Sequence, residues 1–140
     1  MSAEPMMTIL VAGPYRSGTG GDAALIERNL HRLEQAALAI YRRGHVPMIG
    51  EWLALPLAKA AGSARLGDAI SEEFLYPASR RLLSRCDAVL RIGGESKGAD
   101  EDIRAAQRLG LRIYRDIADV PVADVANNQA MATGDIGLTG

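Results

Sequence analysis

Three things are scarce in this sequence: cysteine, long apolar runs and an excess of charge of one sign. The 140 residues include one cysteine, Cys86, and two histidines, His31 and His45. A single cysteine excludes an intramolecular disulfide, and with two distant histidines it does not build a zinc site. We therefore expect no metal, and we predict that Cys86 is a core thiol at the start of a strand.

Membrane and nucleic-acid partners are not expected either. No apolar run approaches the roughly 20 residues that a transmembrane helix needs, and the first seven residues have neither a basic region nor an apolar signal-like core. The 16 basic and 17 acidic residues leave a formal net charge of −1, which provides no general attraction to nucleic acid or to an anionic membrane. These features favour a cytoplasmic protein.

The composition predicts one globular domain followed by a tail. Apolar residues make up 48% and charged residues 24% of the chain, and 140 residues are enough to bury a core. Beyond Val120 the sequence becomes small and polar. We therefore predict a domain over residues 1–120 and a tail over 121–140 that is either disordered or docked on a partner subunit.

Four short apolar runs, at 8–12, 45–49, 86–92 and 111–114, alternate with segments of helical periodicity. Helices are predicted over 22–43 and 98–109. Two less regular helices, over 52–61 and 68–85, contain Pro56 and Pro77, which are expected to break or kink them. This alternation predicts an α/β fold: a three-layer Rossmann-like (flavodoxin-like) domain with a four- to five-stranded, mainly parallel sheet and helices on both faces.

Ligands of such sheets bind beyond the carboxyl ends of the strands, where the loops 13–21, 50–52 and 93–98 are expected to meet. In the last loop two glycines end the strand and a Ser-x-Gly turn opens a helix. The first turn of that helix carries Asp100, Glu101 and Asp102. Free amides and the helix dipole make this place an anion site, and carboxylates there serve as nucleophile or base. They equally stabilise any helix N-terminus, so both interpretations stay open here.

The glycine-rich loop 13–21 fits neither of two common phosphate-binding motifs. A P-loop needs Gly-Lys after its spacer, but Gly18 is followed by Thr19. A dinucleotide fingerprint would have to begin at Gly18, with Glu51 as the ribose-binding acid. Gly18 lies too far beyond the first strand for the tight turn which that motif requires.

Four motifs follow one another along the chain: Gly-Pro-Tyr at 13–15, Gly-His-Val-Pro at 44–47, Cys-Asp-Ala-Val at 86–89 and Ser-Lys-Gly at 96–98. Their ordered set resembles the nucleoside 2-deoxyribosyltransferase-like superfamily, whose members include deoxyribosyltransferases and nucleotide N-glycosidases. The resemblance spans roughly residues 9–114. It implies the same α/β fold, and a site completed by a neighbouring subunit in a homodimer or a larger homo-oligomer.

The resemblance also implies a catalytic carboxylate six residues after the serine. The family has Glu at that position and this chain has Asp102, which is one methylene shorter. A misplacement of about 1 Å can reduce a rate by on the order of 100-fold, so Glu101 is the second candidate. Periodicity favours Asp102, which shares the inner helix face with Ala106, whereas Glu101 shares a solvated face with Arg104 and Arg108.

The remaining candidates bind substrate. The serine hydroxyls and the amides of the Ser-x-Gly turn are predicted to hold a 5′-phosphate with help from Arg16, which is otherwise a solvated loop cation. Tyr15 and Trp52 are predicted to sandwich the base, although Trp52 is equally typical of a core. Glu51 either hydrogen-bonds base or ribose or caps a helix. The substrate-binding set is Gly13, Tyr15, Arg16, Ser17, Glu51, Trp52, Ser96 and Gly98.

The third predicted strand contains two charged residues, and a structural role is expected for Asp87. Arg91 interrupts an apolar run, and a buried cation needs a partner. The candidate partners are Glu95, Asp100 and a ligand phosphate. Asp87 begins the strand, at the edge of the sheet opposite the site.

The sequence therefore leaves two functions open. The first is an enzyme that cleaves the N-glycosidic bond of a small-molecule nucleoside or nucleotide, or transfers its deoxyribosyl group, without a cofactor. The alternative is a non-catalytic nucleotide-binding or sensing module that has lost the catalytic Glu.

Overall fold

The computed structural model describes residues 4–124. The elements follow in the order β1 (Thr8–Ala12), α1 (Ala23–Arg42), β2 (Val46–Ile49), α2 (Gly50–Ala60), α3 (Ala69–Leu83), β3 (Ala88–Arg91), α4 (Lys97–Leu109), β4 (Arg112–Tyr114) and the 3-10 helix η1 (Ile117–Asp119). The four strands pair in the order β2-β1-β3-β4, and every pair is parallel. The predicted three-layer α/β fold is confirmed, with four strands.

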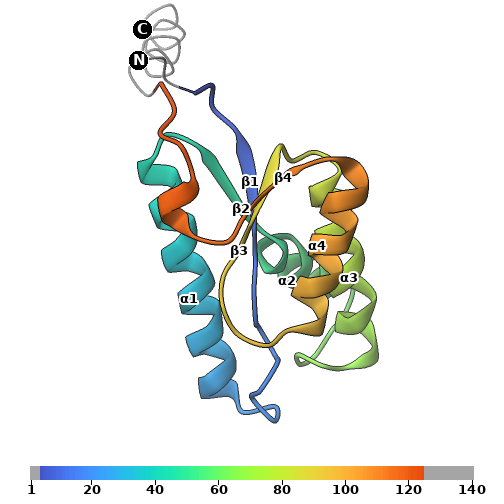
Figure 1. Ribbon diagram of the computed structural model, residues 1–140. Coiled ribbons are helices and arrows are strands. Elements are labelled where there is room, and N and C mark those ends of the chain that lie inside the picture. Colours follow the sequence, from blue (N-terminus) through green and yellow to red (C-terminus); the bar gives the residue numbers. More distant parts are fainter. Residues whose placement is uncertain (1–3, 125–140) are drawn as a thin grey trace, which may run out of the picture.

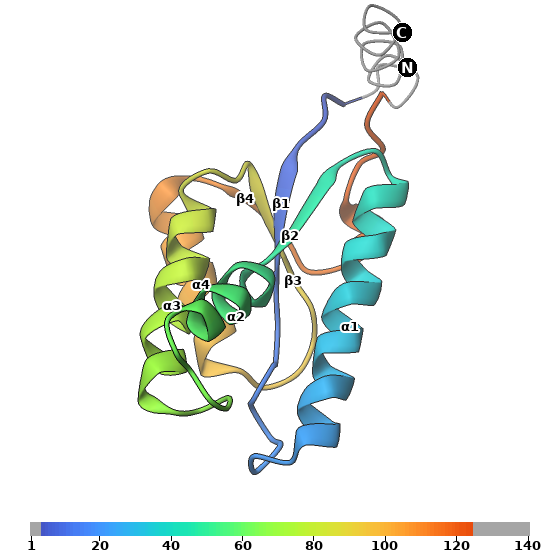
Figure 2. The same ribbon diagram turned by 180° about the vertical axis from the view of Figure 1, so that it is seen from behind.

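The sheet separates two layers of helices (Figures 1 and 2). Helix α1 covers one face, and α3 and α4 cover the other. Side chains of a strand alternate between faces, so Ile9 and Val11 pack in the core beneath α1, while Leu10 and Ala12 pack beneath α4. A strand covered on both faces must be apolar throughout, which explains the uninterrupted run of β1.

The two internal prolines do not end their helices, contrary to the expected break at Pro56. Proline removes one helical hydrogen bond at a cost of about 3 kcal/mol. Ala54 and Ala58, on either side of Pro56, are 0% and 3% exposed, and α2 packs mainly along α3. This burial offsets the missing bond and keeps α2 continuous from Gly50 to Ala60.

His45 connects the start of the chain to the last described segment. The Met7 amide donates to His45 Nδ1 at 3.0 Å, so the proton is on Nε2, which donates to the Pro121 carbonyl at 2.6 Å. Ala123 is 2% exposed and forms an isolated parallel bridge with Glu4. Residues 121–124 therefore pack on the domain, and the rest of the expected tail, 125–140, lies outside the described residues.

Arg91 of β3 and Asp87, which precedes β3, have structural partners. Arg91 Nη2 donates to Asp100 Oδ1 at 2.9 Å and to the Gly94 carbonyl at 3.0 Å, which identifies Asp100 among the expected partners. At the opposite edge, Asp87 Oδ2 accepts from the Thr8 amide at 2.9 Å.

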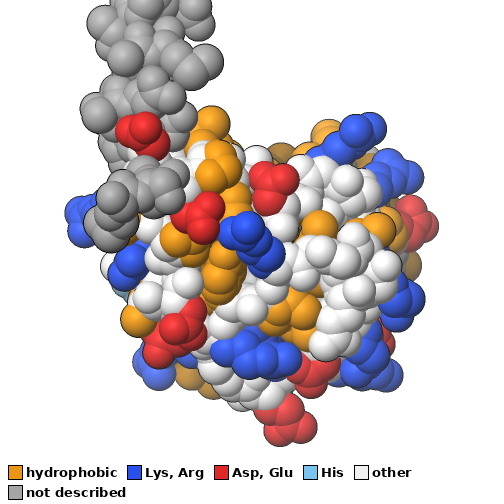
Figure 3. All heavy atoms as spheres, turned by 45° about the horizontal axis from the view of Figure 1, so that its top comes forward, with side chains coloured by type: hydrophobic (Ala, Val, Ile, Leu, Met, Phe, Trp, Pro, Cys, Tyr) orange, Lys and Arg blue, Asp and Glu red, His pale blue; other side chains and the backbone are white. Residues whose placement is uncertain are grey.

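Figure 3 shows the end of the domain where the strands begin, with cations and carboxylates interspersed. Within residues 4–124, no helix has the length and apolar character required to cross a bilayer.

We predict that His45→Ala lowers the free energy of unfolding by about 2–3 kcal/mol, because it leaves the buried Met7 amide without its acceptor and opens a cavity. Urea unfolding followed by circular dichroism measures this. His31→Ala, at an exposed position of α1, is the control and should change stability by less than about 0.5 kcal/mol. Equal effects of the two substitutions would contradict the structural role of His45.

Candidate functional site

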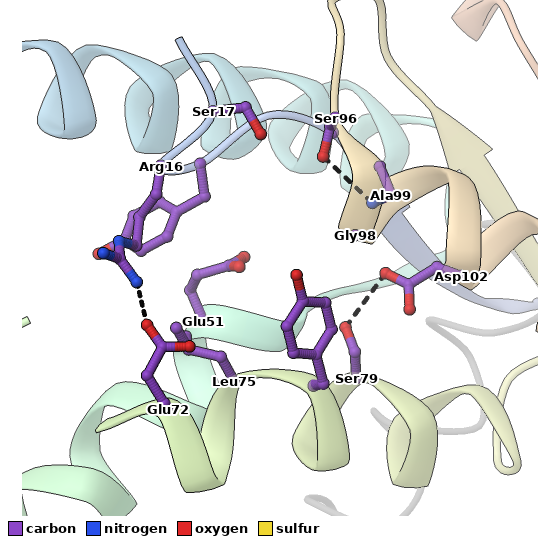
Figure 4. A pocket seen from close by; sticks show the side chains of 13 residues that line it. Arg16, Ser17, Glu51, Glu72, Leu75, Ser79, Ser96, Gly98, Ala99 and Asp102 are labelled. Carbon is purple, nitrogen blue, oxygen red and sulfur yellow. Dashed lines mark hydrogen bonds and ion pairs between the residues drawn. The ribbon is translucent and has the colours of Figure 1, made fainter. Parts of the chain in front are cut away.

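A cavity of ≈ 140 Å³ lies at the carboxyl edge of the sheet, between the loop after β1, the starts of α2 and α4, and one side of α3 (Figure 4). Three loops predicted to meet at this edge contribute to it. The structure brings together the following predicted site residues in its lining: Gly13, Tyr15, Arg16, Ser17, Glu51, Ser96, Gly98 and Asp102.

The loop after β1 is held in place by its neighbours. Asn29 of α1 donates its side-chain amide to the Tyr15 carbonyl at 2.8 Å, and the Thr19 hydroxyl donates to the Arg16 carbonyl at 2.6 Å. Gly18 and Gly20 have positive φ values of 73° and 59°, a conformation that glycine adopts without steric cost. These contacts present Tyr15 and Arg16 to the cavity.

Asp102 projects from α4 into this space and is 7% exposed. Its Oδ2 accepts a hydrogen bond from the Ser79 hydroxyl at 3.3 Å, and its Oδ1 lies 3.7 Å from Arg80 Nε. Both Oδ1 and that Nε are buried without a hydrogen-bond partner among the described residues. Leaving a buried polar atom unsatisfied costs about 1–3 kcal/mol, and such costs are typical of functional sites.

Three acidic groups of the cavity have raised pKa values, and burial is the largest cause of each shift. Burial raises the pKa of Asp102 to about 6, against the opposing effects of Arg80 and of the Ser79 hydrogen bond. Burial also raises the pKa of Glu51 to about 7, and the negative charge of Asp102 adds to this shift. The pKa of Tyr15 is raised by burial and by Glu51. Proton transfer near neutral pH is therefore available in this cavity.

Two predicted residues lie outside the cavity lining. Glu101, the second catalytic candidate, is partly exposed, and its Oε2 lies 3.6 Å from Arg80 Nη2, so its ion-pair partner is Arg80 and not Arg104 or Arg108. Trp52 is 40% exposed, and its Nε1 donates to Glu34 Oε2 of α1 at 2.9 Å. The predicted sandwich of the base between Tyr15 and Trp52 is therefore not the arrangement found.

One wall of the cavity was missed at the sequence level. Helix α3 supplies Glu72, Leu75, Tyr76 and Ser79. Their spacing of three and four residues places them on one face of a helix, and that signal was readable in the sequence. Which of the helix faces turns toward the sheet edge was not readable, because it depends on how α3 packs against α2 and α4.

Two glycines permit this close packing. A Cβ atom at Gly50 would lie 2.6 Å from Ser79 Oγ, and one at Gly98 would lie 3.0 Å from Tyr76 Cε1. Larger residues at the starts of α2 and α4 would therefore require the Ser79 and Tyr76 side chains to shift. The close packing of α3 against Gly50 and Gly98 keeps the Ser79 hydroxyl within hydrogen-bond distance of Asp102.

An ion pair crosses the cavity between its two sides. Arg16 Nη1 pairs with Glu72 Oε1, and the two side chains are 40% and 44% exposed.

At the start of α4, the Ala99 amide donates to Ser96 Oγ at 3.1 Å, so Ser96 is the N-cap. The first amides of the helix have no carbonyl partners one turn earlier, which makes this end suited to an anion.

Comparison with known proteins supports the fold. No protein-family model matches the sequence, and no curated protein does. The fold matches the solved structure of a 2-deoxyribosyltransferase from the psychrotolerant bacterium Bacillus psychrosaccharolyticus, described as a biocatalyst for nucleoside synthesis. The TM-score is 0.55, the match covers 76% of this chain and 69% of that chain, and the sequences are 17% identical. The resemblance drawn from the four motifs is thereby confirmed at the level of the fold.

The raised pKa values of Asp102, about 6, and of Glu51, about 7, have a consequence for stability. Between about pH 4 and pH 7 the folded protein binds protons more tightly than the unfolded chain does, so these groups lower stability as the pH rises. We predict that Asp102→Asn raises the free energy of unfolding by about 1–2 kcal/mol at pH 8 and has little effect at pH 4.5.

Urea unfolding at pH 4.5, 6 and 8 measures this difference. Glu73→Gln, at an exposed position of α3, is the control and should leave the pH dependence unchanged. A loss of stability at pH 8 in Asp102→Asn would show that the ionised carboxylate stabilises the fold.

Proposed function

We propose that the protein cleaves the N-glycosidic bond of a nucleoside or nucleotide, or transfers its 2-deoxyribosyl group, with Asp102 as the catalytic carboxylate. The observation that carries the proposal is the buried, partly unsatisfied carboxylate of Asp102 in a cavity at the carboxyl edge of the sheet. Parallel α/β sheets bind their ligands at this edge. The fold of a 2-deoxyribosyltransferase supports the same reaction class.

The chemistry needs a negative charge beneath the sugar. Breaking the bond between C1′ and the base develops positive charge on the sugar, which a carboxylate stabilises directly or captures as a covalent glycosyl intermediate. With its pKa at about 6, Asp102 is mostly ionised at neutral pH. Its hydrogen bond from Ser79 orients one oxygen and leaves the other without a donor.

A phosphorylated substrate fits the surroundings. A second cavity, of ≈ 520 Å³, shares Ser17 and Ser96 with the first and is also lined by Arg32 and Lys97. Together with the start of α4 and with Arg16, which lines the first cavity and precedes Ser17, these groups provide cations and amides for a 5′-phosphate. Base and sugar then occupy the side that holds Glu51 and Asp102.

The second candidate is a nucleotide-binding module without turnover. It is favoured by the short side chain of Asp102, which is also engaged by Ser79 and lies near Arg80. Such a module would bind nucleotides through the same cavity. The homodimer or larger oligomer that the resemblance implies stays a prediction, as does the absence of a cofactor.

We predict release of free base when the protein is incubated with a panel of ribo- and deoxyribonucleosides and their 5′-monophosphates, measured by chromatography. Asp102→Asn should lower this turnover by about 1,000-fold or more while binding persists, because the amide keeps the shape and loses the charge that stabilises the transition state. Glu101→Gln is the matched control and should change the rate by less than about 3-fold.

Three results would contradict parts of this proposal. Loss of turnover in Glu101→Gln and not in Asp102→Asn would make Glu101 the catalytic carboxylate. Thermal stabilisation by nucleotides without base release would favour the binding module. Neither binding nor release across the panel would contradict both functions.

The ion pair between Arg16 and Glu72 generates a further prediction. Releasing Arg16 by Glu72→Gln should tighten the binding of 2′-deoxyguanosine 5′-monophosphate by about 2–5-fold, because an exposed ion pair contributes up to about 1 kcal/mol. Binding of 2′-deoxyguanosine, which has no phosphate, should not change. Titration calorimetry measures both constants, with Glu73→Gln as the control. Equal changes for the two ligands would show that Arg16 does not face the phosphate.

A further inference from the structure

Cleavage by Asp102 assigns no chemical use to the other two carboxylates of the cavity, Glu51 and Glu72. Glu72 pairs with Arg16, whereas Glu51 forms no ion pair within residues 4–124. Glu51 lies in the first turn of α2, two residues after the end of β2. In Figure 4 its side chain rises from α2 into the space between Arg16 on one side and Asp102 on the other. The side chain therefore reaches the same ligand space as Asp102, from a different element.

The charged and titratable groups around Glu51 leave its carboxylate without a cation. The loop after β1 contributes Tyr15 and Arg16, α3 contributes Glu72 and Tyr76, and α4 contributes Asp102. The only cation among these is Arg16, which is paired with Glu72. Within residues 4–124, Glu51 forms no ion pair. The ionised Asp102 repels the negative charge of Glu51, and the Tyr15 phenol, whose pKa is raised, is uncharged at neutral pH and supplies no cation.

This environment favours the protonated carboxyl. Burial and the nearby Asp102 bring the pKa of Glu51 to about 7, while its own backbone amide opposes the shift. About half of the molecules therefore carry a proton on Glu51 at neutral pH. Asp102, whose pKa is about 6, is mostly ionised under the same conditions. Of two carboxyl groups in one cavity, the one that keeps its proton is suited to act as an acid, and the one that is ionised is suited to act as an anion.

The proposed reaction needs such an acid. When the bond between C1′ and the base nitrogen breaks, its electron pair stays on the base, and an unprotonated base anion is a poor leaving group. A proton delivered in the transition state contributes about 10²–10⁴-fold to such a step. Asp102 cannot deliver it while it acts as an anion beneath the sugar.

We propose that Glu51 is a second catalytic residue, the general acid that protonates the departing base while Asp102 stabilises C1′. This inference rests on the proposed function. The Glu51 proton moves to a ring nitrogen of the base, the C1′–N bond breaks with its electrons moving into the base, and an Asp102 oxygen bonds to or stabilises C1′. Water then adds its hydroxyl to C1′ and returns a proton to Glu51. In a transfer reaction a ring nitrogen of the incoming base bonds to C1′, and the proton lost from that base returns to Glu51.

The leaving group provides the test. A purine methylated at N7 already carries a positive charge and departs as a neutral base, so it needs no acid. The substrates are the 5′-monophosphates of 2′-deoxyguanosine and 2′-deoxyadenosine and their 7-methyl derivatives, with spontaneous base release subtracted. Glu51→Gln keeps the shape of the side chain, and Glu73→Gln on the exposed side of α3 is the matched control.

We expect Glu51→Gln to slow release of the unmethylated bases by about 100-fold or more and release of the methylated bases by less than about 3-fold. In the wild-type protein the rate with unmethylated substrates should fall above about pH 7, where Glu51 loses its proton according to its pKa. The rate with the 7-methyl derivative of 2′-deoxyadenosine 5′-monophosphate should not fall there, because that base has no ring N–H that ionises near neutral pH. This comparison of pH profiles needs no variant, so it stands even if the substitution disturbs folding.

The outcomes separate this inference from the proposed function. Equal losses on both kinds of substrate, no loss on either, or identical wild-type pH profiles would overturn the role of Glu51 and leave the function of Asp102 intact. Absence of base release by the wild-type protein from every substrate would overturn the proposed function and the role of Glu51 with it.

Discussion

The burial of β1 on both faces and along both edges is the constraint on which the rest of the structure depends. Ile9, Leu10 and Val11 are at most 2% exposed, and the strand pairs in parallel with β2 on one side and β3 on the other. A parallel sheet sends all of its carboxyl ends to one edge. The loop after β1, the start of α2 and the start of α4 therefore meet there, although they are separated by tens of residues in the chain.

The cavity at that edge exists because α3 closes it. Its face with Tyr76 and Ser79 approaches the starts of α4 and α2 closely at Gly98 and Gly50, where a Cβ atom would lie 3.0 Å from Tyr76 Cε1 and 2.6 Å from Ser79 Oγ. The hydrogen bond from Ser79 then fixes one oxygen of Asp102. The position of the Asp102 carboxylate is thus decided by packing between helices.

The electrostatics of the cavity oppose folding and favour reactivity. Burial raises the pKa values of Glu51 and Asp102, and the charge of Asp102 adds to the shift of Glu51. The Arg80 guanidinium near Asp102 makes no hydrogen bond with its Oδ1. A site designed for stability alone would fill this space with apolar side chains. The protein instead retains charges whose pKa values, about 6 and about 7, lie where protons are exchanged at physiological pH.

Local sequence determined the elements and the end of the sheet at which the site lies. The apolar run of β1, the Asp22 cap that accepts from the Ala24 amide at 2.9 Å, and the Ser96 cap of α4 are readable because each depends on residues within one or two turns. Periodicity alone placed Asp102 on the inner face of α4, and the structure finds it 7% exposed.

Only the tertiary structure decided the contacts between distant elements. Trp52 lies beside α1 with Glu34, Arg16 pairs with Glu72, and Arg91 takes Asp100 as its partner among three that the sequence allowed. The continuity of α2 through Pro56 likewise depends on its packing along α3. Local propensity is set by neighbouring residues, whereas these partners are separated by 9 to 56 positions and are chosen by how the helices pack on the sheet.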